Sequence, residues 1–398
     1  MDYLNPIYTE KRECQDCYKC VRHCPVKAIK IESGYASVMP ELCILCGQCV
    51  EACPNAAKKV RDDLPQARQL LKLKPRVLVS LAPSYVSEFP ELRPAQLIHA
   101  LKQFGFYGVS ETALGAQEVS ARAAELLRTG TAPVLCSSAC PTVVSYLQKY
   151  RPAAARWITP LLSPLLTHCK MLRQTFGLDI GIVFIGPCIA KKLEAVQHPE
   201  LLDVALTFDD LRRWLEQEKI APAQAAVTDA DRFIPEPAAE GTWYPVDGGM
   251  IAGMKSNCAV NDSSCMAFSG INAVEKALSG LEEFYPQPGD PLQPRSTVPA
   301  AGQGSTAPGE TGLFLELLAC EGGCVNGPRA SSRGSTAFKR QRILRQGHPA
   351  PPALPRAPVI PIQETITAAP PMPPRYPEAQ VREALRLVGK NVPQDELN

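Results

Sequence analysis

Pro187-Cys188-Ile189-Ala190-Lys191-Lys192-Leu193-Glu194 is the central one of three cysteine segments that determine how this chain is interpreted. The other two are Ser137-Ser138-Ala139-Cys140-Pro141 and Cys320-Glu321-Gly322-Gly323-Cys324-Val325-Asn326-Gly327. Together they supply four thiols, which is the number of ligands that a [4Fe–4S] cube requires. Glycines between two of these cysteines would let the backbone approach a cluster closely and point N–H groups at its sulfur atoms. We therefore predict an iron–sulfur site, rather than ordinary buried thiols, at Cys140, Cys188, Cys320 and Cys324.

A second set of cysteines forms an internal repeat near the N-terminus. Cys14-x2-Cys17-x2-Cys20-x3-Cys24-Pro25 is followed by Cys43-x2-Cys46-x2-Cys49-x3-Cys53-Pro54. This is the run of bacterial two-cluster ferredoxins, in which the fourth cysteine of each copy binds the other cluster. It predicts one [4Fe–4S] cluster on Cys14, Cys17, Cys20 and Cys53, and a second on Cys43, Cys46, Cys49 and Cys24. Zinc or a set of redox disulfides is the alternative, which two complete copies with both prolines disfavour.

Length and composition leave room for two or three domains. The chain has 398 residues, of which 45% are hydrophobic and 21% charged, with a formal net charge of +2. This balance gives no indication of a nucleic-acid partner or an acidic membrane surface. The sequence contains no long apolar run and starts without a secretion-signal pattern, so we expect a cytoplasmic protein. In that compartment its 16 cysteines are better explained as metal ligands than as disulfides.

The middle of the chain alternates between strand and helix patterns. After a polar helical joint near 61–73, short apolar runs at 76–82, 134–136 and 180–186 predict buried strands, and 95–104 and 118–128 predict helices. This alternation indicates an α/β domain with largely parallel pairing. Ser84, Cys140 and Cys188 each follow one of the strand runs, at the edge where such sheets bind ligands.

The three cysteine segments closely resemble the signature segments of the [FeFe]-hydrogenase catalytic domain, and the resemblance extends to about residue 345. Ala82-Pro83-Ser84, 204–211 and 245–250 carry further similarity. The resemblance implies an α/β catalytic domain with two lobes of mixed sheet flanked by helices, preceded by a small α+β ferredoxin-like domain. It also implies an H-cluster, a [4Fe–4S] cube bridged to a di-iron unit that carries CO, cyanide and a dithiolate amine.

The same resemblance assigns roles to individual residues. Cys324 would bridge the cube and the di-iron unit, and Lys191 would donate a hydrogen bond to one cyanide. Pro83 and Ser84 would reach the other cyanide, and Glu194 is retained as well.

Several positions depart from the catalytic members of that family. Ala139 stands where they carry a proton-relay cysteine, and Arg122 replaces the outer glutamate of the relay. Glu125 and Thr159 keep a carboxylate and a hydroxyl at the middle positions. Neither alanine nor an always-charged arginine can relay a proton at neutral pH. The methionines that border the di-iron unit are also replaced, by Gly186 and Leu318.

These departures resemble the sensory branch of the family. We expect a hydrogen sensor that oxidises H2 or reduces protons reversibly at low turnover, with electrons relayed through the ferredoxin-type clusters. The expected partners are a ferredoxin-like protein or a downstream PAS, kinase or phosphatase module, and maturation proteins for the di-iron unit. The alternatives are a conventional hydrogenase with another proton route, and an iron–sulfur scaffold protein that lacks the di-iron unit.

The sequence also suggests where the domains begin and end. We expect the ferredoxin-like domain at 1–60 and the hydrogenase-like domain at 61–345, with a flexible insertion at 286–308. A proline-rich linker is predicted at 346–376, and a helix at 377–398 that leads to a missing signalling module. Four cysteines remain, and buried structural thiols are the favoured interpretation for them: Cys136, Cys169, Cys258 and Cys265. A second hypothesis lets Cys136 or Cys169 partly replace the missing relay thiol.

Overall fold

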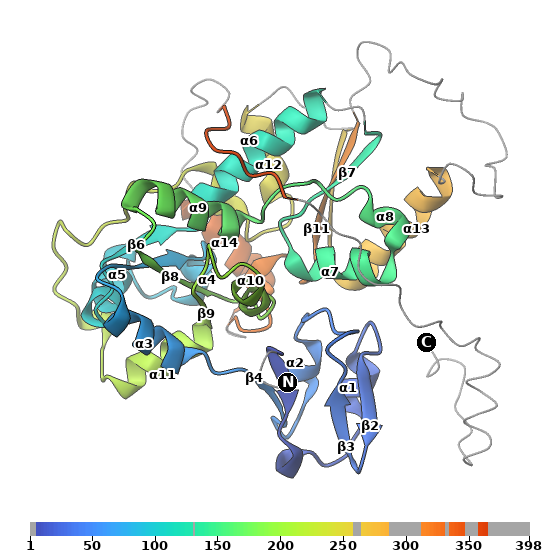
Figure 1. The fold of residues 1–398 in the computed structure, drawn as a ribbon, viewed down its shortest axis with the longest axis horizontal. Coiled ribbons are helices and arrows are strands. Elements are labelled where there is room, and N and C mark those ends of the chain that lie inside the picture. The colour runs from blue at the N-terminus through green and yellow to red at the C-terminus, as the bar shows by residue number, and fades with distance from the viewer. Residues whose placement is uncertain are drawn as a thin grey trace.

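The computed structural model describes residues 5–129, 132–257, 264–285, 312–330, 334–346 and 357–364. A small N-terminal module and a larger α/β domain are visible as separate units in Figure 1. The predicted insertion at 286–308, the helix at 377–398 and Cys258 lie outside the described residues.

The N-terminal module is built from two similar halves. Strand β1 (Ile7–Thr9) pairs antiparallel with β4 (Lys58–Val60), and β2 (Ile29–Glu32) pairs antiparallel with β3 (Tyr35–Val38). A 3-10 turn, η2 (Lys11–Glu13), precedes the first cysteine repeat. Two short helices, α1 (Lys19–His23) and α2 (Gln48–Ala52), lie within the two repeats and contact each other. Each helix carries the third cysteine of its repeat on its buried side, which turns both thiols toward the module interior.

The first lobe of the larger domain is a parallel sheet in the order β6-β5-β8-β9. Its strands are β5 (Val77–Leu81), β6 (Gly108–Glu111), β8 (Gly181–Gly186) and β9 (Val204–Thr207), and every residue in them is buried. Complete burial is expected for a parallel sheet covered on both faces. The helices packed on this sheet are α3 (Leu64–Leu73), α5 (Pro94–Gln103), α9 (Pro164–Phe176) and α11 (Phe208–Gln217).

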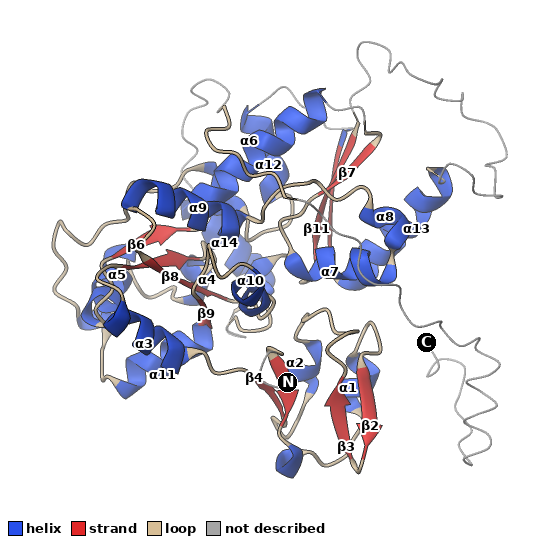
Figure 2. Ribbon diagram, in the orientation of Figure 1, coloured by secondary structure: helices blue, strands red, loops and turns tan. Residues whose placement is uncertain are grey.

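The second lobe is a parallel sheet in the order β10-β11-β7, drawn at the right of Figure 2. Its strands are β7 (Val134–Cys136), β10 (Cys265–Ser269) and β11 (Leu313–Leu318). Helices α7 (Pro141–Tyr150), α8 (Pro152–Ala155) and α13 (Ile271–Phe284) belong to this lobe, and α6 (Ala113–Thr129) packs against both α9 and α12 (Gly249–Asn257). The remaining helical segments are α4 (Tyr85–Glu88), α10 (Lys191–Gln197), α14 (Thr336–Gln346), η3 (Pro222–Gln224), η4 (Glu240–Trp243) and η6 (Cys324–Asn326).

These observations confirm the predicted two-lobed α/β architecture and its strands. Within the described residues both sheets of the larger domain are wholly parallel, rather than mixed. The helix predicted at 118–128 begins earlier, at Ala113, because the preceding turn is small and apolar enough to be buried.

Part of the predicted proline-rich linker is instead docked on the domain. In the segment 357–364, Ile360 and Ile362 are buried in the main hydrophobic core. The backbone N–H groups of Val359 and Ile360 donate to Glu118 Oε1 at 2.8 and 3.1 Å. Alternating isoleucines supply apolar burial, and a buried carboxylate satisfies the backbone, so this stretch is ordered despite its prolines. The linker prediction is therefore wrong for these eight residues.

Candidate functional site

The four thiols of the signature segments line one cavity of about 110 Å³. Cys140 and Cys188 lie in the loops that follow β7 and β8, and Cys320 follows β11. The carboxyl ends of parallel strands from both lobes therefore meet at this cavity, as expected for a ligand site in an open α/β sheet. Its wall also includes Pro83, Ser84, Thr112, Ala139, Phe184, Lys191, Leu318 and Cys324.

Electrostatic interactions show how close the four thiols are. Burial raises the pKa of the Cys320 thiol well above its usual value, and the neighbouring Cys324, Cys140 and Cys188 raise it further. Burial also raises the pKa of Cys188 to about 11, with Cys140 adding to the effect and Lys191 opposing it. Buried thiols in such a group would repel one another as thiolates, and bound metal cations remove that penalty.

The donor set fits a cluster of iron ions. No described cysteine forms a disulfide. In the same part of the chain, no three cysteine, histidine or carboxylate side chains converge on a point that a single metal ion could occupy. A zinc ion would need its thiolates about 2.3 Å from one centre. Four thiols spread around a cavity wall instead match the one-ligand-per-corner arrangement of a cube.

Glycines shape the turn that carries the last two thiols. Gly322 and Gly323 have φ values of +73° and +97°. A Cβ on Gly323 would lie 2.3 Å from the carbonyl oxygen of Pro245, so no other residue fits there without displacing backbone.

Lys191 is the one cation in the described cavity wall. Its Nζ lies 2.8 Å from Glu194 Oε2 and donates to Ser163 Oγ at 3.1 Å. Burial alone would lower the pKa of Lys191, but the Glu194 carboxylate and the thiols of Cys188 and Cys140 raise it above its ordinary value. The side chain therefore stays an ammonium donor beside the thiols, which suits an anionic ligand.

Ser84 supplies a second polar group to the same wall. It is only 2% exposed, and its Oγ has no hydrogen-bond partner among the described residues. A buried hydroxyl without a hydrogen-bond partner lowers the stability of the fold unless an occupant of the cavity forms a hydrogen bond with it. Pro83 precedes it in the loop between β5 and α4, so the predicted Pro83-Ser84 contact with the occupant is geometrically available.

Electrostatic contacts in the N-terminal module link thiols of the two cysteine repeats. The pKa of Cys20 is raised mainly by burial, and Cys53 and Cys14 raise it further. In the other half, burial raises the pKa of Cys46 to about 12, and Cys43 and Cys24 add to that effect. The fourth cysteine of each repeat therefore lies near thiols of the opposite repeat.

The second of these groups adjoins the cavity. Leu45 and Cys46 line its wall, and Cys46 is near enough to raise the pKa of Cys320. Gly47 keeps the two domains in close contact, because a Cβ there would lie 2.3 Å from Pro328 Cβ. Electrons would therefore have a short path between the Cys46 group and the cavity.

The predicted relay residues do not all converge. Ala139 lies in the cavity wall, and behind it Thr159 Oγ1 donates to Ser138 Oγ at 3.1 Å. Glu125 instead forms an ion pair with Arg122 toward the end of α6, where its side chain is 37% exposed. The structure thus joins Thr159 to the wall and ties Glu125 to an arginine.

Gly186 and Leu318, the two positions predicted to replace methionines, differ in packing. A Cβ on Gly186 would lie 2.4 Å from the ring of Phe184, which itself lines the cavity. The phenylalanine ring therefore occupies the space that a larger residue at 186 would need. Leu318, at the end of β11, lines the cavity and is 6% exposed.

The remaining described cysteines lie away from the cavity wall. Cys136 and Cys169 are completely buried in hydrophobic cores. Cys265 begins β10 and is partly buried. This agrees with structural thiols, and the position of Cys169 in the core gives no support to its replacing the relay thiol.

Lys192 is a residue whose importance the sequence analysis missed. Its side chain is fully buried, and its Nζ donates to Asp63, Asp210 and the carbonyl of Ala205, each at 3.1 Å. The adjacent lysines thus have different tasks, one facing the cavity and one anchoring α10 to α11 and to the start of α3.

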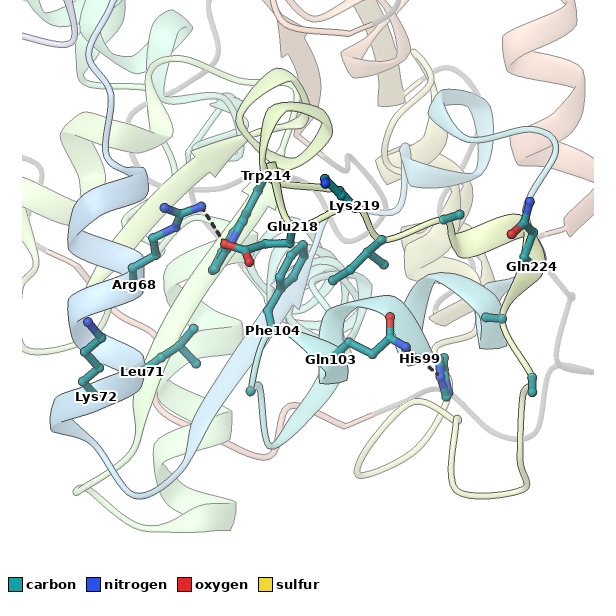
Figure 3. A pocket seen from close by; sticks show the side chains of 15 residues that line it. Arg68, Leu71, Lys72, His99, Gln103, Phe104, Trp214, Glu218, Lys219 and Gln224 are labelled. Carbon is teal, nitrogen blue, oxygen red and sulfur yellow. Dashed lines mark hydrogen bonds and ion pairs between the residues drawn. The ribbon is translucent and has the colours of Figure 1, made fainter. Parts of the chain in front are cut away.

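A larger hollow of about 1110 Å³ lies on the outside of the first lobe (Figure 3). Phe104 stacks on Trp214 at its base, with ring centroids 4.2 Å apart. Arg68 pairs with Glu218 and His99 contacts Gln103, so its labelled polar groups largely satisfy one another. No cysteine lines it.

The fold and the cavity together define a two-module iron–sulfur protein. The chain belongs to the family described as iron only hydrogenase large subunit, C-terminal domain, whose model matches residues 75–328. Residues 6–54 match the 4Fe-4S dicluster domain. These matches confirm the predicted family, fold class and cluster content.

Individual relatives are distant. Iron hydrogenase 1 of Clostridium pasteurianum is 25% identical over 309 residues, which are 69% of this chain and 53% of that protein. The chain thus spans about half the length of that relative. The periplasmic [Fe] hydrogenase large subunit of Nitratidesulfovibrio vulgaris is 25% identical over 82% of this chain and 86% of its own length. One similar solved structure is an [FeFe]-hydrogenase studied for oxygen damage to the 2Fe subcluster of its H cluster. It has a TM-score of 0.51 at 17% identity, over 71% of this chain and 88% of that one. A similarity of this kind supports the fold alone.

One negative finding concerns membranes. In the portion of the chain that the structure describes, no helix combines the length and the apolar character needed to cross a bilayer.

Proposed function

We propose that this protein is a hydrogen-sensing [FeFe]-hydrogenase that interconverts H2 with protons and electrons at low turnover in the cytoplasm. One observation carries the proposal. Four thiols, the ammonium of Lys191 and the unpaired hydroxyl of Ser84 face a single cavity, whereas Ala139 gives its wall only a methyl group. The groups that would hold the cofactor are present, and a group that would carry protons is missing.

The residues that would hold the H-cluster follow from this geometry. Cys140, Cys188 and Cys320 would bind the cube, and Cys324 would join the cube to the di-iron unit. Lys191 and Ser84 would donate hydrogen bonds to its cyanide ligands, with Glu194 keeping the lysine charged and oriented. When bound, the H-cluster supplies the H2 chemistry, H2 ⇌ 2 H⁺ + 2 e⁻.

Because the cavity wall carries an alanine at position 139, we expect protons to move slowly to and from the cavity. A cysteine there could hold a proton between the cavity and the Thr159 and Ser138 hydroxyls, but an alanine cannot. Arg122 forms an ion pair with Glu125, so that carboxylate is not free to take part in a proton relay. Low turnover suits a sensor, because the redox state of the site then follows H2 without consuming much of it.

Electrons would pass between the cavity and the N-terminal clusters. The contact at Gly47 and the position of Cys46 in the cavity wall support this order. The Cys14 group, with the exposed Cys17, would then meet the electron partner. We further propose that a ferredoxin-like protein or a PAS, kinase or phosphatase module reads this redox state, and that maturation proteins supply the di-iron unit.

The infrared spectrum of the anaerobically matured full chain tests the proposal. CO and cyanide stretching bands that change under H2, together with dye-linked turnover far below that of catalytic hydrogenases, would support it. A spectrum without CO and cyanide bands, in a protein whose iron content shows its cubes to be assembled, would leave only the scaffold alternative.

A conventional hydrogenase with another proton route remains the second candidate, because a specific groove favours it. A groove of about 450 Å³ is lined by Ser138, Ser163, Glu194, His198 and Glu364. It brings water-accessible polar groups to the back of the cavity wall. High dye-linked turnover that Ala139→Cys does not increase would favour this candidate over the sensor.

A further inference from the structure

A continuous chain of buried hydroxyl and imidazole groups ends at the cavity. His168, on α9, lies between Ser80 and Ser110, with Nδ1 2.8 Å from Ser80 Oγ and Nε2 2.8 Å from Ser110 Oγ. Ser80 Oγ lies 2.8 Å from Thr112 Oγ1, and Thr112 lines the cavity. His168 and both serines are completely buried, and Thr112 is 6% exposed.

The fold places these groups with little freedom. Ser80 and Ser110 face each other as register partners in the parallel pair of β5 and β6. Helix α9 approaches them closely because Gly115 of α6 lacks a side chain, since a Cβ there would lie 2.6 Å from the backbone nitrogen of His168. Burial lowers the pKa of His168 to about 3, so the imidazole is neutral and carries one proton on one of its two nitrogens.

The position of that proton fixes the direction of every hydrogen bond in the chain. If Nε2 carried it, Nε2 would donate to Ser110, and the Ser110 O–H would have no acceptor among the described residues. If Nδ1 carries it, Ser110 donates to Nε2 and Nδ1 donates to Ser80. The Ser80 O–H must then donate to Thr112, its only other described partner. Each arrangement therefore leaves one hydroxyl without a described acceptor, Ser110 in the first and Thr112 in the second. Ser110 is completely buried, whereas Thr112 lines the cavity, where water or a ligand can accept from it. Because an unpaired donor is most costly where nothing else can accept its hydrogen bond, the second arrangement is favoured.

We propose that His168 is a positioning residue whose Nδ1–H tautomer, acting through Ser80, makes the Thr112 hydroxyl a hydrogen-bond donor to an anionic ligand in the cavity. In this arrangement the Thr112 O–H is the only donor of the chain without an acceptor inside the described protein. It faces the same cavity as Ser84, whose Oγ is also unpaired. Two buried hydroxyl donors and the Lys191 ammonium then line one cavity, which matches an occupant with several acceptor atoms. The inference rests on the proposed function for the identity of that acceptor, a cyanide ligand, but the tautomer does not depend on it.

The tautomer is measured directly in the full-length protein with no di-iron unit loaded. In protein labelled with ¹⁵N-histidine, one imidazole is expected to have a protonated Nδ1 and a bare Nε2 at pH 7. Loss of this signal in His168→Gln assigns it. If that variant does not fold, Ser110→Ala assigns it by moving the same signal, because it removes the donor to Nε2. A protonated Nε2, or a doubly protonated ring, would overturn the inference.

The effect on the ligand is measured by infrared spectroscopy of protein loaded with the di-iron unit. Thr112→Val removes the donor and should shift one cyanide band. Thr167→Val is the matched control, because Thr167 is equally buried beside His168 but does not line the cavity. Cyanide bands that are the same in both variants would refute the role of Thr112. If the wild type shows no cyanide bands at all, the proposed function fails, whereas the tautomer result still stands.

Discussion

Replacing Lys192 with methionine should destabilise the larger domain strongly. The Lys192 side chain is completely buried, and its Nζ donates three hydrogen bonds, two of them to the carboxylates of Asp63 and Asp210. Methionine has a similar volume, so the cost comes from removing a buried cation rather than from a cavity. Asp63 keeps its pair with Arg61, and Asp210 keeps Arg213, but both lose the completely buried ammonium. Removing one partner of a buried ion pair typically costs about 3–5 kcal/mol. We expect the free energy of unfolding of Lys192→Met to fall by about that amount.

Urea unfolding followed by tryptophan fluorescence measures this loss, since Trp214 lies on α11 with Asp210. Lys74→Met is the control, because its partner Asp179 is largely exposed and water screens that pair. Adding Asp210→Asn to Lys192→Met should recover part of the stability by removing a carboxylate charge that has lost its buried ammonium partner. A Lys192→Met variant no less stable than Lys74→Met would refute the reasoning.

Four further predictions concern the site and its surroundings. Ala139→Cys should raise dye-linked H2 turnover on the order of 100-fold, the lower range for a positioned proton carrier; no increase would argue against the interrupted relay. Cys46→Ser should abolish electron exchange between the cavity and the other clusters in electron paramagnetic resonance titrations, and an unchanged titration would contradict the assigned path. Cys169→Ala should leave cluster spectra unchanged, because Cys169 lies in the core and not in the cavity wall. Burial raises the pKa of Glu111 to about 7, so its contribution to stability is full below about pH 4.5 and is lost as the pH rises through 7. Urea unfolding at several pH values should show the wild type losing on the order of 3 kcal/mol relative to Glu111→Gln by pH 8.

Motif spacing predicted the family and its cluster content, because thiol ligands must recur at fixed intervals to surround a cluster. The crossed assignment of Cys24 and Cys53 stays a prediction, with which their proximity to thiols of the opposite repeat is consistent. The alternation of apolar runs with helical patterns likewise predicted the strands that end at the cavity. In both cases the pattern that determines the structure lies within a short stretch of the sequence.

Long-range polar contacts could not be predicted in this way. The different orientations of Lys191 and Lys192 depend on carboxylates at positions 63, 194 and 210, which only the folded chain brings together. The His168 chain depends on strand register, which no local pattern reveals. The segment 357–364 was predicted to be a linker because its prolines outweigh two isoleucines in composition, although the isoleucines determine its packing.

That segment also has a mechanical consequence. Its end is clamped to the loop that precedes α9, since the N–H of Leu162 donates to the carbonyl of Ile362 at 2.8 Å and the N–H of Glu364 donates to the carbonyl of Pro160 at 3.0 Å. The clamped stretch lies between Thr159 and Ser163, the residue that holds the Lys191 ammonium. The segment 357–364 therefore braces the loop that carries Ser163, and through Ser163 it helps to hold the Lys191 ammonium in place.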